Sequence, residues 1–195
     1  MSIQDWWETA HKSANRRWLT ASALSSYLKF FDAEDVYNKA HYILEIGCGT
    51  CVATKQMDDV GKNLTVLDIS QQALKTASQW ATTVHSSEIK LLPANYFDLA
   101  ISHLVAQHMN DTDLQDQLTY VIKSLMDNGR FLLQFADAKN HPQEFTIRHE
   151  ERGGMLRRPF QMTGLVENVG GKVIKNVERK INNNVMWYGY HIIKA

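Results

Sequence analysis

A buried strand that runs directly into a glycine turn is the feature that most restricts how this chain can fold. Residues 42–46 (YILEI) are mostly apolar, and Gly47 and Gly49 follow at once. A short apolar run of this kind is typical of a strand that is buried on both faces. The glycines let the backbone turn sharply and let a ligand approach the main chain without a Cβ atom in the way. The segment therefore predicts a ligand site at the end of a buried strand.

Further apolar strands alternate with helical segments along the chain. The pattern predicts strands at residues 64–67, 83–85, 97–102 and 130–135. It predicts helices between them, up to about Asp59, from Ser70 to Trp80 and from Asp111 to Met126. Repeated strand–helix units indicate a parallel sheet with helices on both faces.

The two ends of the chain have a different character. Residues 6–37 carry apolar side chains close to helical spacing, which predicts one or two helices, and residues 32–35 resemble a polar turn. After a helix that ends at the glycines 170–171, residues 172–178 and 185–194 each alternate like a strand. Strands joined by so short a link are expected to pair antiparallel.

The charge of the chain is balanced, with 21 Lys and Arg against 21 Asp and Glu in 195 residues. No excess charge attracts the chain to nucleic acid or to an anionic membrane, so we expect neither as a partner. Residues 1–8 contain no basic stretch and no apolar run, and no segment approaches the roughly 18 apolar residues of a membrane span. We therefore expect a cytoplasmic protein.

The two cysteines of the chain, Cys48 and Cys51, form a C-x-x-C sequence in the glycine turn. This spacing can mark a thioredoxin-like redox pair or half of a zinc site. The chain has no second cysteine pair, and no histidine pair lies nearby at ligand spacing. We favour a glycine-rich ligand loop and expect no metal, while the redox and metal alternatives stay open.

Asp68 follows the next predicted strand and lies at the same edge of the sheet as the glycine turn. A carboxylate there can accept hydrogen bonds from both hydroxyls of a ribose. The dinucleotide fingerprint G-x-G-x-x-G is not met, because its third glycine would fall at Val52. A pyrophosphate needs that open helix start, so the pattern favours a nucleoside without phosphates.

Four segments, in the right order, resemble motifs of the class I S-adenosylmethionine-dependent methyltransferases. Residues 45–50 (EIGCGT) resemble the first motif, E/D-x-G-x-G-x-G, and residues 67–70 (LDIS) resemble the second. Residues 92–99 (LPANYFDL) look like the family's entry to strand four, and residues 125–131 (LMDNGRF) are similar to its L-x-P-G-G turn into strand five.

The resemblance covers about residues 42–194 and departs from the family pattern at two positions. Cys51 stands where the family usually has its third glycine, which narrows the room around the cofactor. Asn128 replaces a residue of the glycine turn before strand five.

The resemblance implies a fold and a cofactor. It implies one domain, with residues 1–40 as a helical lid and residues 41–195 as a Rossmann-like core. The core would be an α/β fold with a seven-stranded, mostly parallel sheet, an antiparallel C-terminal hairpin and helices on both faces. The cofactor would be S-adenosyl-L-methionine, bound by Glu45, Gly47, Cys48, Gly49, Asp68, Ile69, Glu88 and Ser102. Asp68 would hold the ribose hydroxyls and Ile69 would pack on the adenine. Glu88 would lie near the adenine amino group, although a solvated loop charge is an equal alternative.

Residues 102–105 (SHLV) follow strand four, where amino-methylating adenine and glutamine enzymes have an Asn/Asp-Pro-Pro-Tyr/Phe run. With the balanced charge, this difference favours methyl transfer to an oxygen or nitrogen of a small molecule. His103 would lie near the reacting methyl group and serve as a general base, and a structural histidine is the alternative. His108 is expected to pack on the inner face of the next helix.

The substrate itself is less constrained by the sequence. A group of arginines could clamp an acidic substrate, although a solvated charged loop is the plainer interpretation; it comprises Arg148, Arg152, Arg157 and Arg158. Two other functions remain as alternatives, a protein or nucleic-acid methyltransferase and a non-catalytic cofactor-binding or partner subunit. The oligomeric state stays open.

Overall fold

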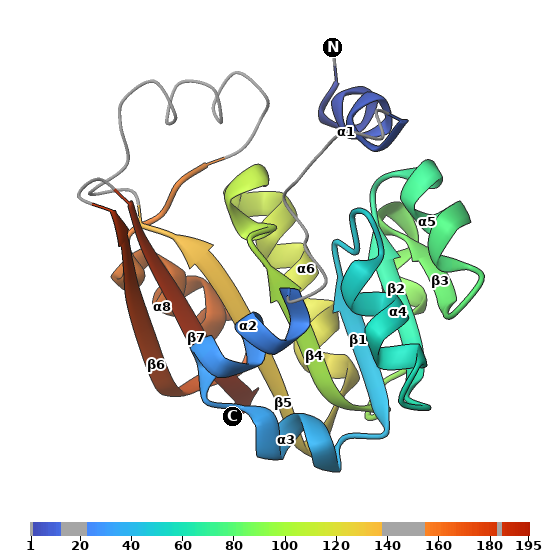
Figure 1. The fold of residues 1–195 in the computed structure, drawn as a ribbon. Helices are drawn as coiled ribbons and strands as arrows, with labels where there is room; N and C mark the ends of the chain where they lie inside the picture. Colours follow the sequence, from blue (N-terminus) through green and yellow to red (C-terminus); the bar gives the residue numbers. More distant parts are fainter. Residues whose placement is uncertain (1, 13–22, 138–154, 183–184) are drawn as a thin grey trace.

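One seven-stranded sheet forms the centre of the computed structural model, which describes residues 2–12, 23–137, 155–182 and 185–195. The strands lie in the order β3-β2-β1-β4-β5-β7-β6 (Figure 1). β1 to β5 are parallel, β7 runs antiparallel to β5, and β6 runs antiparallel to β7. The predicted fold class is therefore confirmed. The strand bounds are β1 Tyr42–Ile46, β2 Asn63–Asp68, β3 Thr82–His85, β4 Phe97–His103, β5 Leu125–Ala136, β6 Gly171–Asn182 and β7 Val185–Lys194.

Helices cover both faces of the sheet (Figure 1). Because alternate residues of a strand point to opposite faces, Ile43 packs in one apolar cluster and Leu44 in the other. The first cluster includes side chains of α2 (Ala23–Phe31), α3 (Glu34–Lys39) and α4 (Val52–Asp58). The second includes side chains of α6 (Asp111–Ser124) and α8 (Pro159–Asn168). The remaining elements are α1 (Ile3–Lys12), α5 (Gln71–Ala77) and the 3-10 helices η1 (Ser86–Leu91) and η2 (Ala106–His108).

Several predicted element ends are confirmed, and their local chemistry explains why. β1 has the predicted bounds. Ser70 precedes α5 as the predicted cap, and its hydroxyl accepts a hydrogen bond from the Ala73 N–H at 3.2 Å. This bond satisfies one of the donors that the first turn of a helix leaves free. Such caps can be read from sequence because their partners are only three residues apart.

Residues 32–35 are not the polar turn that the sequence predicts. Asp32, with φ 52°, turns the chain after α2, and Glu34 already begins α3. Glu34 and Asp35 lie in the first turn of this helix, where the helix dipole stabilises negative charge. The acidic residues therefore start a third helix before the sheet.

The segment before strand five also differs from the prediction. α6 ends at Ser124 rather than Met126, and the expected glycine turn lies inside β5. A Cβ atom on Gly129 would lie 2.8 Å from the Phe97 carbonyl oxygen, so the close approach of β4 and β5 requires glycine there. The register between the two strands shifts from Phe97 to Leu99, which accommodates the extra residues.

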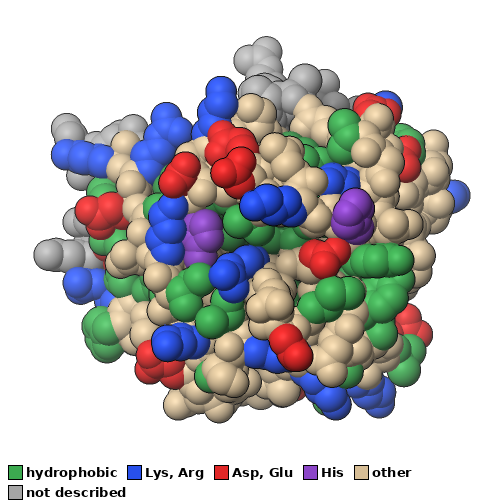
Figure 2. All heavy atoms as spheres, turned by 90° about the horizontal axis from the view of Figure 1, so that it is seen from below, with side chains coloured by type: hydrophobic (Ala, Val, Ile, Leu, Met, Phe, Trp, Pro, Cys, Tyr) green, Lys and Arg blue, Asp and Glu red, His purple; other side chains and the backbone are tan. Residues whose placement is uncertain are grey.

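The face at the amino ends of the parallel strands carries interspersed basic and acidic side chains (Figure 2). This distribution agrees with the net charge of zero. Within the described ranges, no helix combines the length and the apolar character that crossing a membrane requires.

Arg157 is a structural residue and not a free member of an arginine clamp. Its side chain is 1% exposed, and its Nε lies 2.8 Å from the Asp111 carboxylate. Its terminal nitrogens donate hydrogen bonds, each of 2.9 Å, to the carbonyl oxygens of Ala106, Met109 and Met155. The residue therefore fixes η2 and the start of α6. Arg158 is paired with Asp137 at 3.3 Å, and residues 148 and 152 lie outside the described residues.

Replacing Arg157 by leucine should lower the free energy of unfolding by about 3 kcal/mol, because buried carbonyl oxygens lose their donor. Urea unfolding measures this loss. The control is Lys55→Leu, which removes an ion pair to Asp59 between side chains that are 53% and 56% exposed. Such an exposed pair contributes less than about 1 kcal/mol. Equal losses in the two variants would contradict the structural role of Arg157.

Candidate active site

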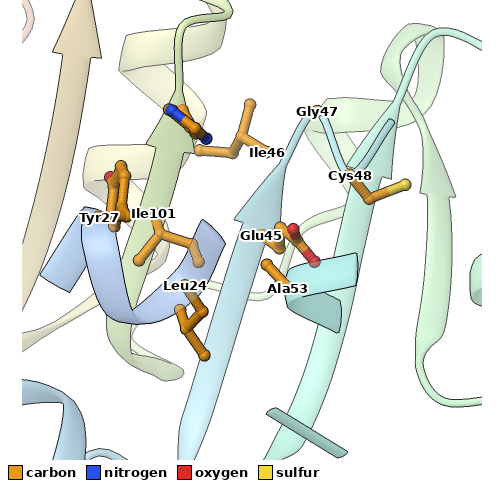
Figure 3. A pocket seen from close by; sticks show the side chains of 9 residues that line it. Leu24, Tyr27, Glu45, Ile46, Gly47, Cys48, Ala53 and Ile101 are labelled. Atoms are coloured by element: carbon orange, nitrogen blue, oxygen red, sulfur yellow. The ribbon is translucent and has the colours of Figure 1, made fainter. Parts of the chain in front are cut away.

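A small cavity of about 70 Å³ lies at the carboxyl ends of β1 and β4 (Figure 3). This is the edge at which parallel α/β sheets bind their ligands. Its walls come from α2, from β1 and its glycine turn, from α4 and from β4. The lining residues are Leu24, Tyr27, Glu45, Ile46, Gly47, Cys48, Ala53, Ile101 and His103.

The chain turns sharply at the glycines after β1, as the sequence predicts. Gly47 and Gly49 have φ values of 73° and 55°, a conformation that favours glycine. The Gly47 N–H donates to the Leu67 carbonyl oxygen at 2.7 Å and so ties the turn to β2. A Cβ atom on Gly47 would lie 2.4 Å from Cγ2 of Val105, which follows β4. No larger residue fits at this position.

Asp68 joins the glycine turn to the start of α5. Its side chain is buried, with 6% of its surface exposed. One carboxylate oxygen accepts a hydrogen bond from the Gly49 N–H at 3.2 Å, and the other accepts one from the Ser70 N–H at 2.8 Å. Each oxygen can accept more than one hydrogen bond, so the carboxylate retains capacity for a ligand hydroxyl.

Glu45 is a buried acid inside the cavity wall. The Thr54 hydroxyl donates a hydrogen bond of 2.5 Å to its carboxylate. Burial raises the pKa of Glu45 to about 7, the Thr54 hydrogen bond opposes that rise, and the nearby Asp68 charge adds to it. Near neutral pH the residue is therefore poised between its charged and neutral forms.

His103 is the last residue of β4, one residue beyond the predicted strand end, and it lines the cavity. Burial lowers its pKa to about 4, well below the ordinary value of 6.5. The imidazole is therefore neutral at neutral pH, and it packs edge-on against the Tyr27 ring at 5.3 Å between centroids.

Tyr27, which the sequence analysis did not single out, fixes α2 to the sheet. Its hydroxyl donates to the Leu132 carbonyl oxygen at 2.5 Å and accepts from the Ser102 N–H at 3.2 Å. Ser102 is fully buried, and its hydroxyl has no hydrogen-bond partner among the residues that the structure describes. Ser102 and His103 are consecutive residues of β4, so their side chains point to opposite faces of the sheet. Ser102 does not line the cavity.

The predicted adenine-side residues lie at the ends of β2 and β3. Ile69 is half-buried after β2, and Glu88 is exposed on η1. Between them lies His85, which the sequence analysis missed. The Ile69 carbonyl oxygen is 2.9 Å from Nε2 of His85, so that nitrogen carries the proton and the ring joins the two strand ends. The sequence could have pointed to His85, because it is the last residue of a predicted strand, at the edge where the site was expected.

Helix α1 lies over the same edge of the sheet, next to α5 (Figure 1). The Glu8 carboxylate accepts hydrogen bonds from the Gln71 and Gln72 N–H groups at 2.6 and 3.2 Å, at the start of α5. Trp7 contacts the His108 ring with centroids 4.9 Å apart. His108 lies on η2 and not on the inner face of the following helix, so its predicted position was wrong. It packs against Trp7 of α1 instead. These contacts hold α1 against α5 and η2, and a lid formed by residues 1–40 stays a prediction.

The two cysteines of the turn are both buried and free. The Cys51 thiol donates a hydrogen bond to the Cys48 sulfur at 3.6 Å, and Cys51 precedes α4 with φ 61°. In the described part of the chain, no group of three or more His, Cys, Asp or Glu side chains could hold a metal ion.

Residues 44–133 match the model of a family described as a methyltransferase domain. This segment runs from β1 into β5 and includes the glycine turn, Asp68 and His103. None of the curated proteins matches the chain.

Solved structures share the fold at low sequence identity. Magnesium protoporphyrin IX methyltransferase from Synechocystis PCC 6803, with bound S-adenosylhomocysteine, has a TM-score of 0.72 and 11% identity, over 99% of this chain and 98% of that chain. Mitomycin 7-O-methyltransferase has a TM-score of 0.68 and 17% identity, over 100% and 61%. A phosphoethanolamine N-methyltransferase from Haemonchus contortus has a TM-score of 0.69 and 14% identity, also over 100% and 61%. The chain thus spans about three fifths of the last two proteins.

The raised pKa of Glu45 predicts a pH-dependent stability. An unfolded glutamate titrates near 4.5, so the folded state holds this proton more tightly. The resulting stabilisation is complete below about pH 4.5 and is lost as the pH rises through about 7. It amounts to about 3 kcal/mol, from 1.36 kcal/mol per pKa unit.

Urea unfolding at pH 5 and pH 8 measures this effect. Glu45→Gln, which keeps the shape of a neutral acid, should remove that part of the pH dependence. Glu167→Gln, at an exposed position on α8, is the control and should retain it. A full pH dependence in Glu45→Gln would show that another group is responsible.

Proposed function

We propose that this chain, which belongs to the class I, Rossmann-like S-adenosylmethionine-dependent methyltransferases, transfers the methyl group to an oxygen or nitrogen of a small molecule. The observation that carries the proposal is the arrangement at the carboxyl edge of the sheet. There the glycine turn and Asp68 lie beside a cavity that contains a neutral histidine. The first two suit a nucleoside cofactor, and the third suits an acceptor that must lose a proton.

The residues at this edge fit S-adenosyl-L-methionine. The glycine turn has no room for a Cβ atom at Gly47 and presents bare backbone to the cleft. In the proposed arrangement, Glu45, Gly47, Cys48 and Gly49 contact the methionine and ribose portion. Asp68 accepts hydrogen bonds from the ribose hydroxyls. The adenine packs on Ile69 with Glu88 near its amino group. The Ser102 side chain points away from the cavity, so Ser102 is left out of these contacts.

The bound cofactor supplies an electrophilic methyl group on sulfur. The chain contributes by holding the acceptor in line with that group, which can account for most of the acceleration. His103 accepts the proton of a hydroxyl acceptor as the methyl group is transferred, because its imidazole is neutral at working pH. α1 limits the access of water at the carboxyl edge of the sheet, since Glu8 fastens it to the start of α5.

The small-molecule substrate is supported by the similar structures. One is an O-methyltransferase of mitomycin by name, and another is an N-methyltransferase of phosphoethanolamine by name. We therefore keep both acceptor atoms. We do not extend the proposal to an acidic substrate, because Arg157 is bound within the fold.

Calorimetry tests the cofactor site. The protein should bind S-adenosylmethionine and S-adenosylhomocysteine but not NAD, since the third glycine of the dinucleotide fingerprint is absent. Asp68→Ala should weaken binding by a factor of ten to several hundred, because two charge-assisted hydrogen bonds of about 1.5–3 kcal/mol each are lost. Asp127→Ala, an exposed position at the start of β5, should bind normally.

Three outcomes would count against this proposal. Tight binding of NAD without S-adenosylmethionine binding would overturn the cofactor. Normal affinity of Asp68→Ala would remove Asp68 as the ribose ligand. Cofactor binding without methyl transfer to any small hydroxyl or amine compound, but with transfer to a protein or nucleic acid, would favour that alternative class of substrate.

His103→Ala should reduce turnover of a hydroxyl acceptor by about 10²-fold, the lower end of the range for a positioned base, because its pKa lies below working pH. Affinity for S-adenosylhomocysteine should be unchanged. The rate of the unmodified protein should show no step near pH 6.5, since the imidazole is already neutral there. His108→Ala is the control and should alter stability rather than turnover. A near-normal rate for His103→Ala on a hydroxyl acceptor would exclude it as the base.

A further inference from the structure

The C-x-x-C sequence in the glycine turn has a feature that methyl transfer does not use, a pair of adjacent thiols. We infer that Cys48 and Cys51 are an oxidative modification site, at which a small hydroperoxide converts the two thiols into a disulfide that weakens cofactor binding. The effect on the cofactor rests on the proposed function, whereas formation of the disulfide does not.

The two sulfur atoms already lie close together. They are 3.6 Å apart, and the Cys51 N–H donates to the Cys48 carbonyl oxygen at 2.8 Å, which keeps the turn closed. A disulfide bond is about 2.05 Å long, so the sulfurs must approach by about 1.5 Å. Side-chain rotation with a small backbone adjustment can provide a movement of this size.

Cys51 occupies a backbone conformation that glycine adopts more readily. Its φ of 61° lies in the left-handed region, at the position of the third glycine of the family motif. A cysteine there is strained relative to glycine. Such strain persists where the side chain has a role. The Cys51 thiol contacts the Cys48 sulfur and the carbonyl oxygens of Gly49 and Ala73.

Cys48 lies at the cavity, which has room for molecules little larger than water, but only 2% of its surface is exposed. In Figure 3 its sulfur points away from Tyr27, so a peroxide reaches it only through a local opening of the turn. The hydrogen bond with Cys51 and burial raise the pKa of the Cys48 thiol well above its ordinary value. Because the thiolate is the reactive form, oxidation is slow and needs an excess of peroxide.

The reaction balances with hydrogen peroxide as the only co-reactant. The Cys48 sulfur attacks one peroxide oxygen and the O–O bond breaks, which gives a sulfenic acid and one water that carries the thiol proton. The Cys51 sulfur then attacks the Cys48 sulfur and forms the S–S bond. The second oxygen leaves as water with the Cys51 proton. Two electrons pass from the sulfurs to the peroxide.

The disulfide would disturb the predicted ribose site. The Cys48 thiol contacts the Asp68 carboxylate at 3.6 Å, and the same oxygen accepts the Gly49 N–H. Drawing the Cys48 sulfur toward Cys51 takes it from this contact and reshapes the turn that holds Asp68. By linkage, a bound cofactor should in return shift the equilibrium toward the reduced thiols, so that the disulfide becomes easier to reduce.

Counting thiols tests the modification. The purified protein is treated with excess hydrogen peroxide at pH 8, unfolded, and alkylated with N-ethylmaleimide before its mass is measured. The chain has two cysteines, so a disulfide within one chain must join them. We expect the mass of two hydrogens to be lost, no alkylation, and recovery of both thiols after dithiothreitol. Two alkylated thiols, or a sulfinic acid in place of the disulfide, would overturn the modification site.

Calorimetry with S-adenosylhomocysteine tests the consequence. Binding should be at least tenfold weaker in the oxidised protein and should recover after dithiothreitol. Cys51→Ser keeps a side chain of similar size in the same conformation but cannot form the disulfide. Peroxide can then give only a sulfenic acid on Cys48, so the affinity of this variant should fall less than that of the unmodified protein, and an equal fall would show that the disulfide is not the cause.

The two arms separate the possible failures. An oxidised protein that binds as tightly as the reduced one would leave the disulfide but overturn its effect on the cofactor. A reduced protein that does not bind S-adenosylhomocysteine would overturn the proposed function, while the thiol count would still decide the modification site.

Discussion

The rest of the site depends on the hydrogen bonds that backbone N–H groups donate to the Asp68 carboxylate. Asp68 is the last residue of β2. Its carboxylate accepts the N–H of Ser70, just before α5, and the N–H of Gly49 from the turn after β1. One buried charge therefore fixes two strand ends and a glycine turn relative to one another. A buried carboxylate needs hydrogen-bond donors or a charged partner, and here the donors are backbone N–H groups. They hold the carboxylate at the edge of the sheet proposed for the cofactor.

The opposite wall of the site depends on packing between layers. Tyr27 carries its hydroxyl from α2 to the backbone of β4 and β5, and its ring lies against His103. Burial among these groups keeps the imidazole neutral, so the same contacts that order the sheet set the protonation state of the proposed base. On the other side of the sheet edge, Arg157 fixes η2, which follows β4. The positions of His103 and Val105 are thus determined from both sides.

Much of the fold could be predicted because its signals are local. The alternation of apolar strands and helices gave the parallel sheet, and Ser70 gave the start of α5. Gly47, Gly49 and Asp68 were recognised because a glycine turn and a strand-end acid follow one another at a characteristic spacing. The errors have two origins. Acidic residues suit both a polar turn and the first turn of a helix, so Glu34 and Asp35 did not distinguish the two. The segment before β5 is decided by the close approach of β4 and β5, which local pattern does not contain.

The sequence by itself determined the class of fold, the edge of the sheet proposed for the cofactor and the residues of the glycine turn, because backbone geometry and side-chain periodicity act over a few residues. Only the tertiary structure decided what the environment does to these groups. It showed where Tyr27 and Glu8 bind and that Arg157 is held within the fold. It also showed that the Ser102 side chain points away from the cavity and that the two cysteine sulfurs lie 3.6 Å apart. It also moved the pKa of His103 and Glu45, since burial depends on every layer packed around a group and not on its neighbours in the chain.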